Sequence, residues 1–160
     1  MAPIGVNGAR SSGFIPKEKP AMNPLAFAAA LTLLAAPALA QDQSSSLRLS
    51  FETGASTGAV LVAVYDSEAA YSNGEPVRRA RVEPGAGPAV AEFDGLEAGD
   101  YAVKAFHDLN GDGRMNVNPF GIPLEPFAFS NNAAGDRGPA SWARARFAVS
   151  GATAQTISIR

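Results

Sequence analysis

The stretch that decides the fold class is Ala59–Tyr65, which reads AVLVAVY. All of its residues are apolar, as expected for a strand that is covered on both faces. Before it, Leu47–Glu52 (LRLSFE) alternates apolar and polar residues. Because successive strand residues point to opposite faces, this alternation is typical of a strand with one buried and one wet face. Both patterns indicate β-structure.

Five more stretches of this kind follow. They are Pro76–Glu83, Ala89–Phe93, Tyr101–His107, Ala143–Val149 and Thr153–Ile159. No window after residue 40 has a convincing helical period, and Gly, Pro and Asn punctuate the strands. We therefore predict an all-β fold, a single antiparallel β-sandwich of about seven strands. A long loop segment rich in Asn, Gly and Pro is expected at 108–142. Arg144 and Arg146 are expected to share one face of their strand, and Arg78, Arg79 and Arg81 form another small basic cluster. Either could bind an anionic ligand, although solvated strand faces usually look like this.

Residues 1–40 are predicted to be a leader with a signal peptide. The apolar run Leu25–Ala36 has the length of a signal-peptide core and is shorter than the about 20 residues of a membrane span. Pro37 ends the run, and the tripeptide ALA that follows predicts cleavage after Ala40. Met22 is an alternative start, although the basic residues of a leader lie upstream of it. We expect residues 41–160 to form the exported domain, periplasmic or extracellular, with no transmembrane segment.

Composition excludes several classes of function. The chain has 13 Lys and Arg, 15 Asp and Glu, one His and no Cys. Without a basic block there is nothing to bind nucleic acid. The missing Cys excludes a disulfide scaffold, a Cys-ligated metal and a thiol nucleophile, and one His excludes a multi-His metal site. The expected partner is an envelope or extracellular ligand.

The loop after the strand at 101–107 reads DLNGDGRMN and suggests a ligand. Its side-chain oxygens fall at positions 1, 3, 5 and 9 with Gly at 6, as in the first half of an EF-hand Ca²⁺ loop. Position 12 is Pro119 instead of Glu, so a further carboxylate is needed, and Glu125 and Asp136 are the nearest downstream. Arg114 would offer its backbone carbonyl. The candidate Ca²⁺ ligands are Asp108, Asn110, Asp112, Arg114, Asn116 and Glu125. Alternatively, the loop is a hairpin whose side chains cap their own backbone.

The segment Met115–Trp142, which we call the covering segment, is too long for an ordinary connection. It carries the large apolar side chains Phe120, Ile122, Leu124, Phe127, Phe129 and Trp142. So many apolar groups indicate a segment packed down on the domain. Its run SNNA at 130–133 could offer amides to a polar ligand or be a simple turn.

A hydrolase site built on His107, Asp108 and Ser130 is a further interpretation. Adjacent strand residues point to opposite faces, so His107 and Asp108 do not form a natural dyad. No G-x-S-x-G motif is present. We therefore expect no enzymatic activity, and a His107 that is semi-buried on an apolar face.

Two stretches resemble known families. Phe93–Tyr101 (F-x-G-L-x-x-G-x-Y) resembles a turn of transthyretin-like (prealbumin-like) and carboxypeptidase-regulatory-like sandwiches. We expect Gly95 and Gly99 to take positive φ there, Leu96 to plug the end of the sandwich, and the Tyr101 hydroxyl to bond to backbone. The stretch AVKAFHDLNGDGRMNVNPFGIPLEPFAFSNNA, with RGPASWARARF after it, resembles the exported bacterial family known as domain of unknown function 2141. The matching residues are His107, Asp108, Asn110, Asp112, Gly113, Gly121, Ile122, Pro123, Glu125, Phe129, Ser130, Asn131, Asn132, Gly138 and Pro139. The sequence departs from the family at Ala140, where the family often has a second Pro. The resemblance implies a signal peptide and one β-sandwich-like domain, but no activity.

Three functions follow from these features. The leading hypothesis is an exported, non-enzymatic β-sandwich that binds Ca²⁺ or a polar ligand through the loop and the covering segment. The second is a metal-free structural or envelope-interaction module, which predicts an exposed apolar patch around Phe120–Phe129. The third is a hydrolase that uses His107.

Overall fold

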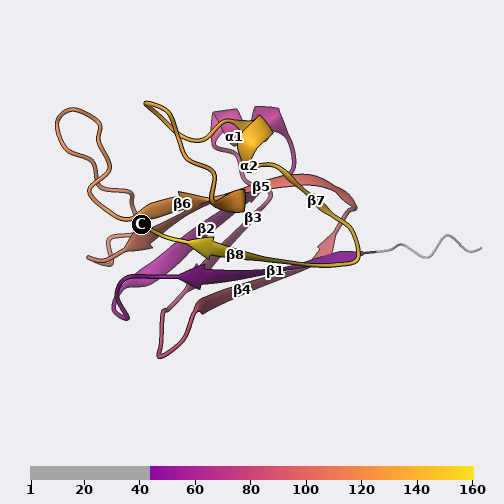
Figure 1. The fold of residues 1–160 in the computed structure, drawn as a ribbon, viewed down its shortest axis with the longest axis horizontal. Coiled ribbons are helices and arrows are strands. Elements are labelled where there is room, and N and C mark those ends of the chain that lie inside the picture. Colours follow the sequence, from indigo (N-terminus) through magenta and orange to yellow (C-terminus); the bar gives the residue numbers. More distant parts are fainter. Residues whose placement is uncertain (1–43) are drawn as a thin grey trace, which may run out of the picture. The chain divides into compact units, whose positions relative to one another are not determined.

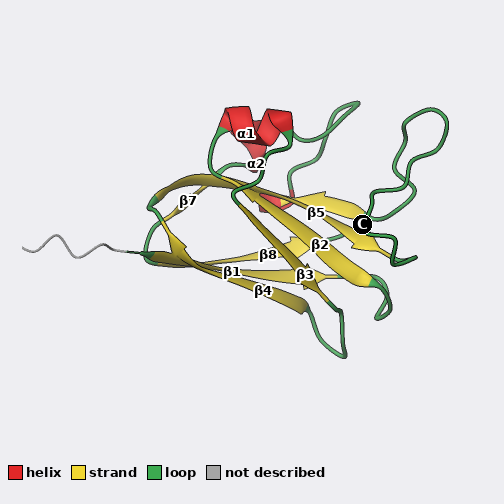
Figure 2. Cartoon of the chain, turned by 180° about the vertical axis from the view of Figure 1, so that it is seen from behind, coloured by secondary structure: helices red, strands yellow, loops and turns green. Residues whose placement is uncertain are grey.

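The computed structural model describes residues 44–160, so the predicted leader and its cleavage site lie outside the described residues. Figures 1 and 2 show the strands in layers, with short helices above one layer. The strands are β1 (Ser45–Glu52), β2 (Ala59–Tyr65), β3 (Arg78–Val82), β4 (Ala89–Leu96), β5 (Gly99–Asp108), β6 (Phe127–Phe129), β7 (Phe147–Val149) and β8 (Ala152–Ser158). The helices are α1 (Glu68–Asn73), the 3₁₀ turn η1 (Ser130–Asn132) and α2 (Trp142–Ala145).

The smaller sheet has the order β4-β1-β8, and the larger has the order β3-β2-β5-β6, with β7 also paired to β5. The alternate residues of each strand that face the other sheet form the main core. Leu49 and Phe51 of β1 meet Val62 of β2 and Val103 of β5 in this cluster, and all four are at most 3% exposed. The predicted all-β sandwich is therefore confirmed.

One strand pair departs from the antiparallel prediction. β8 runs parallel to β1, with Leu49 opposite Gln155. The reason is that β7 and β8 do not pair with each other as a hairpin. Gly151, with φ 59°, turns the chain from the larger sheet, where β7 pairs with β5, into the smaller sheet. Ser46 donates its N–H to the Gly151 carbonyl at 2.9 Å and fixes this crossing.

The predicted strand Ala143–Val149 is largely wrong. Its first part is helix α2, and only Phe147–Val149 forms a strand. Consequently Arg144 and Arg146 do not share a strand face. Tertiary packing overrides the local alternation here, because the Trp142 ring packs against the Tyr71 ring of α1 with centroids 5.9 Å apart.

Helix α1 was not predicted either, although its ends carry ordinary signals. Ser67 caps it by accepting the Ala70 N–H at 3.3 Å, and Gly74 closes it with φ 74°. Figure 1 shows α1 and α2 together over one end of the larger sheet. Tyr65, Ala102 and Phe129 lie beneath them in a second apolar cluster. No helix of residues 44–160 covers the rest of this outer face.

The turn between β4 and β5 behaves as the sequence predicts. Gly95 has φ 70°, Leu96 is 3% exposed, and the Tyr101 hydroxyl donates to the Glu97 carbonyl at 3.0 Å. Gly99 instead belongs to β5 with an ordinary φ. Among the helices of residues 44–160, none is long and apolar enough to cross a membrane.

Candidate functional site

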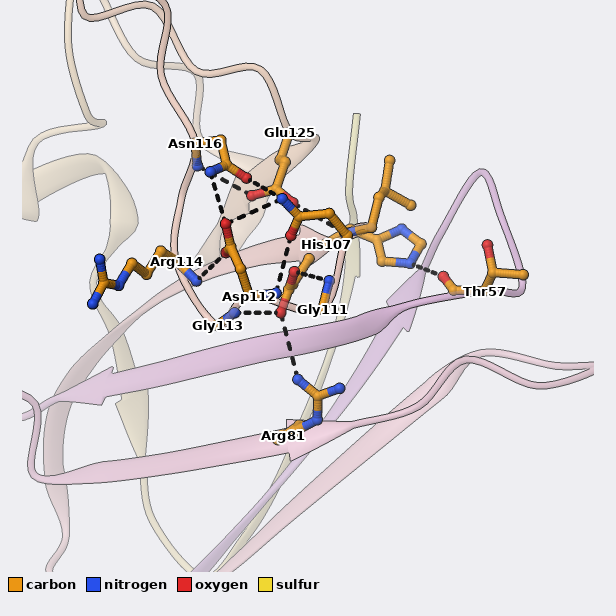
Figure 3. A network of polar contacts seen from close by, with 12 residues as sticks. Thr57, Arg81, His107, Gly111, Asp112, Gly113, Arg114, Asn116 and Glu125 are labelled. Carbon is orange, nitrogen blue, oxygen red and sulfur yellow. Dashed lines mark hydrogen bonds and ion pairs between the residues drawn. The ribbon is translucent and has the colours of Figure 1, made fainter.

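The loop at 108–116 is anchored by Asp108, the last residue of β5. Its side chain is fully buried, and Oδ1 accepts the Gly111 N–H at 2.7 Å. Oδ2 accepts the Gly113 N–H at 2.9 Å and lies 3.4 Å from the Arg81 guanidinium (Figure 3). These contacts satisfy the buried carboxylate and close the loop on itself.

Gly58 holds the loop from the other side. With φ +82° it passes so close to β5 that a Cβ atom would lie 2.3 Å from the Asp108 carbonyl oxygen. This position requires glycine for both its conformation and the available space. The β1–β2 connection therefore fixes where the loop starts.

Three polar side chains of the loop converge at its exposed end. The Asn110 amide nitrogen donates to Asp112 Oδ2 at 3.1 Å and to Asn116 Oδ1 at 2.9 Å. Asn116 Nδ2 also donates to Asp112 Oδ2, at 2.9 Å. The bond from Asn116, and then the bond from the Arg114 N–H, lower the pKa of Asp112 below its usual value. Asp112 is thus an ionised acceptor at neutral pH.

Glu125 joins the two ends of the loop. Oε1 accepts the Leu109 N–H at 3.0 Å and Oε2 accepts the Asn116 N–H at 3.2 Å, and the residue is 7% exposed. It reaches this place because the chain folds back between Val117 and Pro123, which form an isolated antiparallel bridge. Glu125 is therefore the downstream carboxylate that reaches the loop.

The other candidate ligands lie elsewhere. Asp136 is exposed and pairs with its neighbour Arg137 at 3.7 Å. Figure 3 shows the Arg114 side chain directed away from the cluster, to which this residue contributes its backbone N–H. In residues 44–160, no three His, Asp or Glu side chains gather as a metal-ligand set. A cation here would have to use amide oxygens beside the carboxylates.

His107 and Ser130 have structural partners. His107 is 1% exposed, and its Nε2 lies 2.7 Å from the Thr57 carbonyl, which assigns the proton to that nitrogen. The Ser130 hydroxyl donates to the Ala145 carbonyl at 2.6 Å and accepts the Val103 N–H at 2.9 Å. In the described part of the chain the two side chains do not form a nucleophile–base pair.

The amides of the SNNA run are used internally. Asn131 Nδ2 donates to the carbonyls of Arg144, Ala145 and Arg146, at 2.9 to 3.2 Å. Asn132 Oδ1 accepts the Ser158 N–H at 2.8 Å. The run therefore joins α2 to β8, which agrees with the turn interpretation and leaves little for a polar ligand.

The covering segment is only partly packed down. Phe129 is 7% exposed and Trp142 packs against the second apolar cluster. Phe120, however, is 88% exposed and Leu124 is 65% exposed. The exposed large apolar residues in the described chain are Leu109, Val117, Phe120, Ile122, Leu124 and Phe127, all between positions 109 and 127. The prediction of a covered segment is thus wrong for its middle, because the fold-back that delivers Glu125 lifts this stretch away from the core.

Sequence reasoning missed the outer face of the larger sheet as a site. The apolar run Ala59–Tyr65 contained the relevant signal. Its residues Leu61 and Ala63 lie on the face of β2 opposite the core, so this second face is apolar as well. The rest of that face comes from β3 and β6, which the sequence does not place beside β2 and β5.

Fold and site together define a small β-sandwich with a D-x-N-x-D-G loop at the end of a central strand. Residues 52–158 match the model of the family described as "Uncharacterized protein conserved in bacteria (DUF2141)", and the chain belongs to this family. No curated protein sequence and no solved structure gives a significant match. The family membership confirms the resemblance in the motifs at 107–139.

Proposed function

We propose that this protein is an exported, non-enzymatic binding module whose loop at 108–116 holds Ca²⁺ together with Glu125. The observation that supports this most is the convergence of Asp112 and Asn116. Their side-chain oxygens both lie about 3 Å from one point, which the Asn110 amide nitrogen occupies. A hard cation attracts the same oxygens as an N–H donor does, with shorter distances.

The binding step would be a small rearrangement of the loop. Turning the Asn110 amide moves its nitrogen away from Asp112 and Asn116 and directs its own oxygen toward the cation, at the cost of the 3.0 Å bond that this oxygen accepts from the Asp112 N–H. Asp112 supplies a full negative charge. Asp108 Oδ1 and the two Glu125 oxygens each keep a second lone pair beside their one backbone N–H bond. So few charged ligands, without a bidentate Glu, suit the weak affinity of extracellular sites, with a Kd of about 10⁻⁴–10⁻³ M.

Thermal unfolding of the full chain, first in EDTA and then in millimolar Ca²⁺, tests this proposal. Saturation at 100 times Kd stabilises a folded protein by about 2.7 kcal/mol, and 10 times Kd by about 1.4 kcal/mol. We expect Ca²⁺ to raise the midpoint of the wild type, and Asp112→Asn to abolish the rise. Asp136→Asn is the matched control, because it removes an exposed carboxylate of the same segment away from the loop. No rise in the wild type would contradict the proposal.

The second candidate is a metal-free interaction module. It is favoured by the exposed apolar side chains between positions 109 and 127, because monomeric proteins rarely gather such groups on one surface. This candidate expects the same midpoint with and without Ca²⁺. The hydrolase alternative has less support, since His107 and Ser130 are both buried and bonded to backbone.

A further inference from the structure

The outer face of the larger sheet carries a groove of about 1050 Å³. Its floor is the apolar side of β2, β5 and β6, with Leu61, Phe106 and Phe127 among its residues. The covering segment walls it with Phe120 and Ile122 on one side. Pockets for small molecules usually span about 300–1000 Å³ and are lined mostly by apolar groups. The volume of the groove is slightly above this range.

The charged groups that line the groove are all positive. They are Arg79, Arg81, Lys104 and Arg137. Arg81 faces Asp108 at 3.4 Å and Arg137 faces Asp136 at 3.7 Å, so both are partly neutralised. This leaves Arg79 and Lys104 without a carboxylate partner among residues 44–160.

Lys104 and Arg79 differ in whether other groups of the protein already hold their charged ends. The Lys104 ammonium donates to the Tyr71 carbonyl at 2.7 Å and lies 4.0 Å from the Tyr71 ring centroid. Burial lowers the pKa of Lys104. Arg79 is exposed on β3, opposite Ala63 of β2, and its guanidinium fork matches a carboxylate. Of the groove's cations, Arg79 is thus the one that is exposed and has no carboxylate partner among residues 44–160.

We propose that this groove binds one molecule of a long-chain fatty acid, with the alkyl chain on Leu61, Phe106 and Phe127 and the carboxylate on Arg79. Charge complementarity supports a ligand with a single negative charge, because Arg79 is the exposed cation of the groove without a carboxylate partner in the described residues. The inference stands apart from the Ca²⁺ proposal, since the floor and Arg79 belong to the sheet.

Two other occupants fit the groove less well. A second copy of the chain would bring the same cations face to face, which repels. A flat membrane surface would not reach the recessed part of the groove, where Phe129 is 7% exposed. A fatty acid avoids both problems, because its carboxylate attracts the cations and its flexible alkyl chain can enter the recessed part of the groove.

Displacement of fluorescent cis-parinarate by hexadecanoate, measured on the full chain below the micellar concentration of the acid, tests the proposal. We expect one-to-one binding in both EDTA and Ca²⁺, so that a failed Ca²⁺ site leaves this result unchanged. Arg79→Gln should weaken hexadecanoate binding by about tenfold or more, the loss typical of a charge-assisted hydrogen bond. Arg144→Gln, the same charge change on α2 outside the groove, should leave it unaltered.

Phe120→Ser tests the apolar wall without touching the core, because this side chain is 88% exposed. It should weaken binding while the melting temperature stays the same. The proposal is overturned by absent hexadecanoate binding, or by equal affinities of Arg79→Gln and Arg144→Gln. Binding to phosphatidylglycerol vesicles without uptake of the free acid, or dimerisation that hides the groove, would overturn it in favour of the other occupants.

Discussion

Replacement of Ser130 by Ala tests how the larger sheet is completed. β5 pairs with β7 over Gly99–Tyr101 and with β6 over Lys104–Phe106, so this edge of Ala102 and Val103 has no strand partner in the part of the chain that the structure describes. The Ser130 hydroxyl fills this gap by accepting the Val103 N–H at 2.9 Å and donating to the Ala145 carbonyl at 2.6 Å. One side chain therefore replaces a missing piece of β-ladder.

The cost of the substitution follows from burial. Ser130 and Val103 are both fully buried, so Ser130→Ala leaves the Val103 N–H without an acceptor and without water. An unsatisfied buried polar group costs about 1–3 kcal/mol. The Ala145 carbonyl adds little, because it still accepts the Asn131 amide at 3.2 Å. We expect the free energy of unfolding to fall by about 1–3 kcal/mol.

Urea unfolding followed by the fluorescence of Trp142, the single Trp, measures this loss. The midpoint should move to lower urea with an unchanged m-value, since the surface exposed on unfolding stays the same. Ser72→Ala on the exposed face of α1 is the matched control and should change stability by less than about 0.5 kcal/mol. A Ser130→Ala protein that is as stable as this control would refute the reasoning.

Three further substitutions test other contacts. Burial raises the pKa of Tyr71 to about 12, so the unfolded chain loses this proton first and stability falls as the pH rises from 10 to about 12. Tyr71→Phe should reduce this fall of the urea midpoint with pH, and an equal fall in both proteins would contradict the assignment. Gly58→Ala should destabilise by at least about 1–3 kcal/mol in the same assay, because its Cβ meets the Asp108 carbonyl at positive φ, whereas Gly54→Ala has open space and should cost little. Asn131→Asp replaces the amide that donates to three carbonyls by an acceptor, so it should lower the melting temperature and reduce the free energy of unfolding by about 1–3 kcal/mol. Asn118→Asp is the control, because it keeps the oxygen that accepts the Phe120 and Ile122 N–H groups and should not change stability.

The parts of the fold that depend on local pattern were predictable. β2 begins and ends where the apolar run does, because a strand buried on both faces leaves a continuous signal. β6 was assigned to a loop, since Phe127–Phe129 is too short to show alternation and is extended only because β5 pairs with it. α2 was missed for a similar reason, because the packing of Trp142 on Tyr71 lies outside any local window.

The candidate loop was predictable and the groove was not. Asp108, Asn110, Asp112 and Asn116 lie within one tight turn, so spacing alone brings them together. Glu125 was named as a candidate from its distance along the chain, and the fold-back at Val117 and Pro123 delivers it. The groove needs Arg79 from β3 and Phe127 from β6, which become neighbours only through the strand order β3-β2-β5-β6.

The parallel pairing of β1 with β8 has a consequence for the order of folding. Seven residues of β1, from Ser46 to Glu52, pair with residues Ala152–Ser158, about a hundred positions later in the chain. A growing chain that has not reached those residues leaves one side of β1 as an open edge, where another unfinished chain can pair. Because such distant partners must meet before the smaller sheet is complete, we expect this pairing to slow the folding of the domain. β1, the first strand of the domain, thus completes its pairing only when β8, the last strand, has been made.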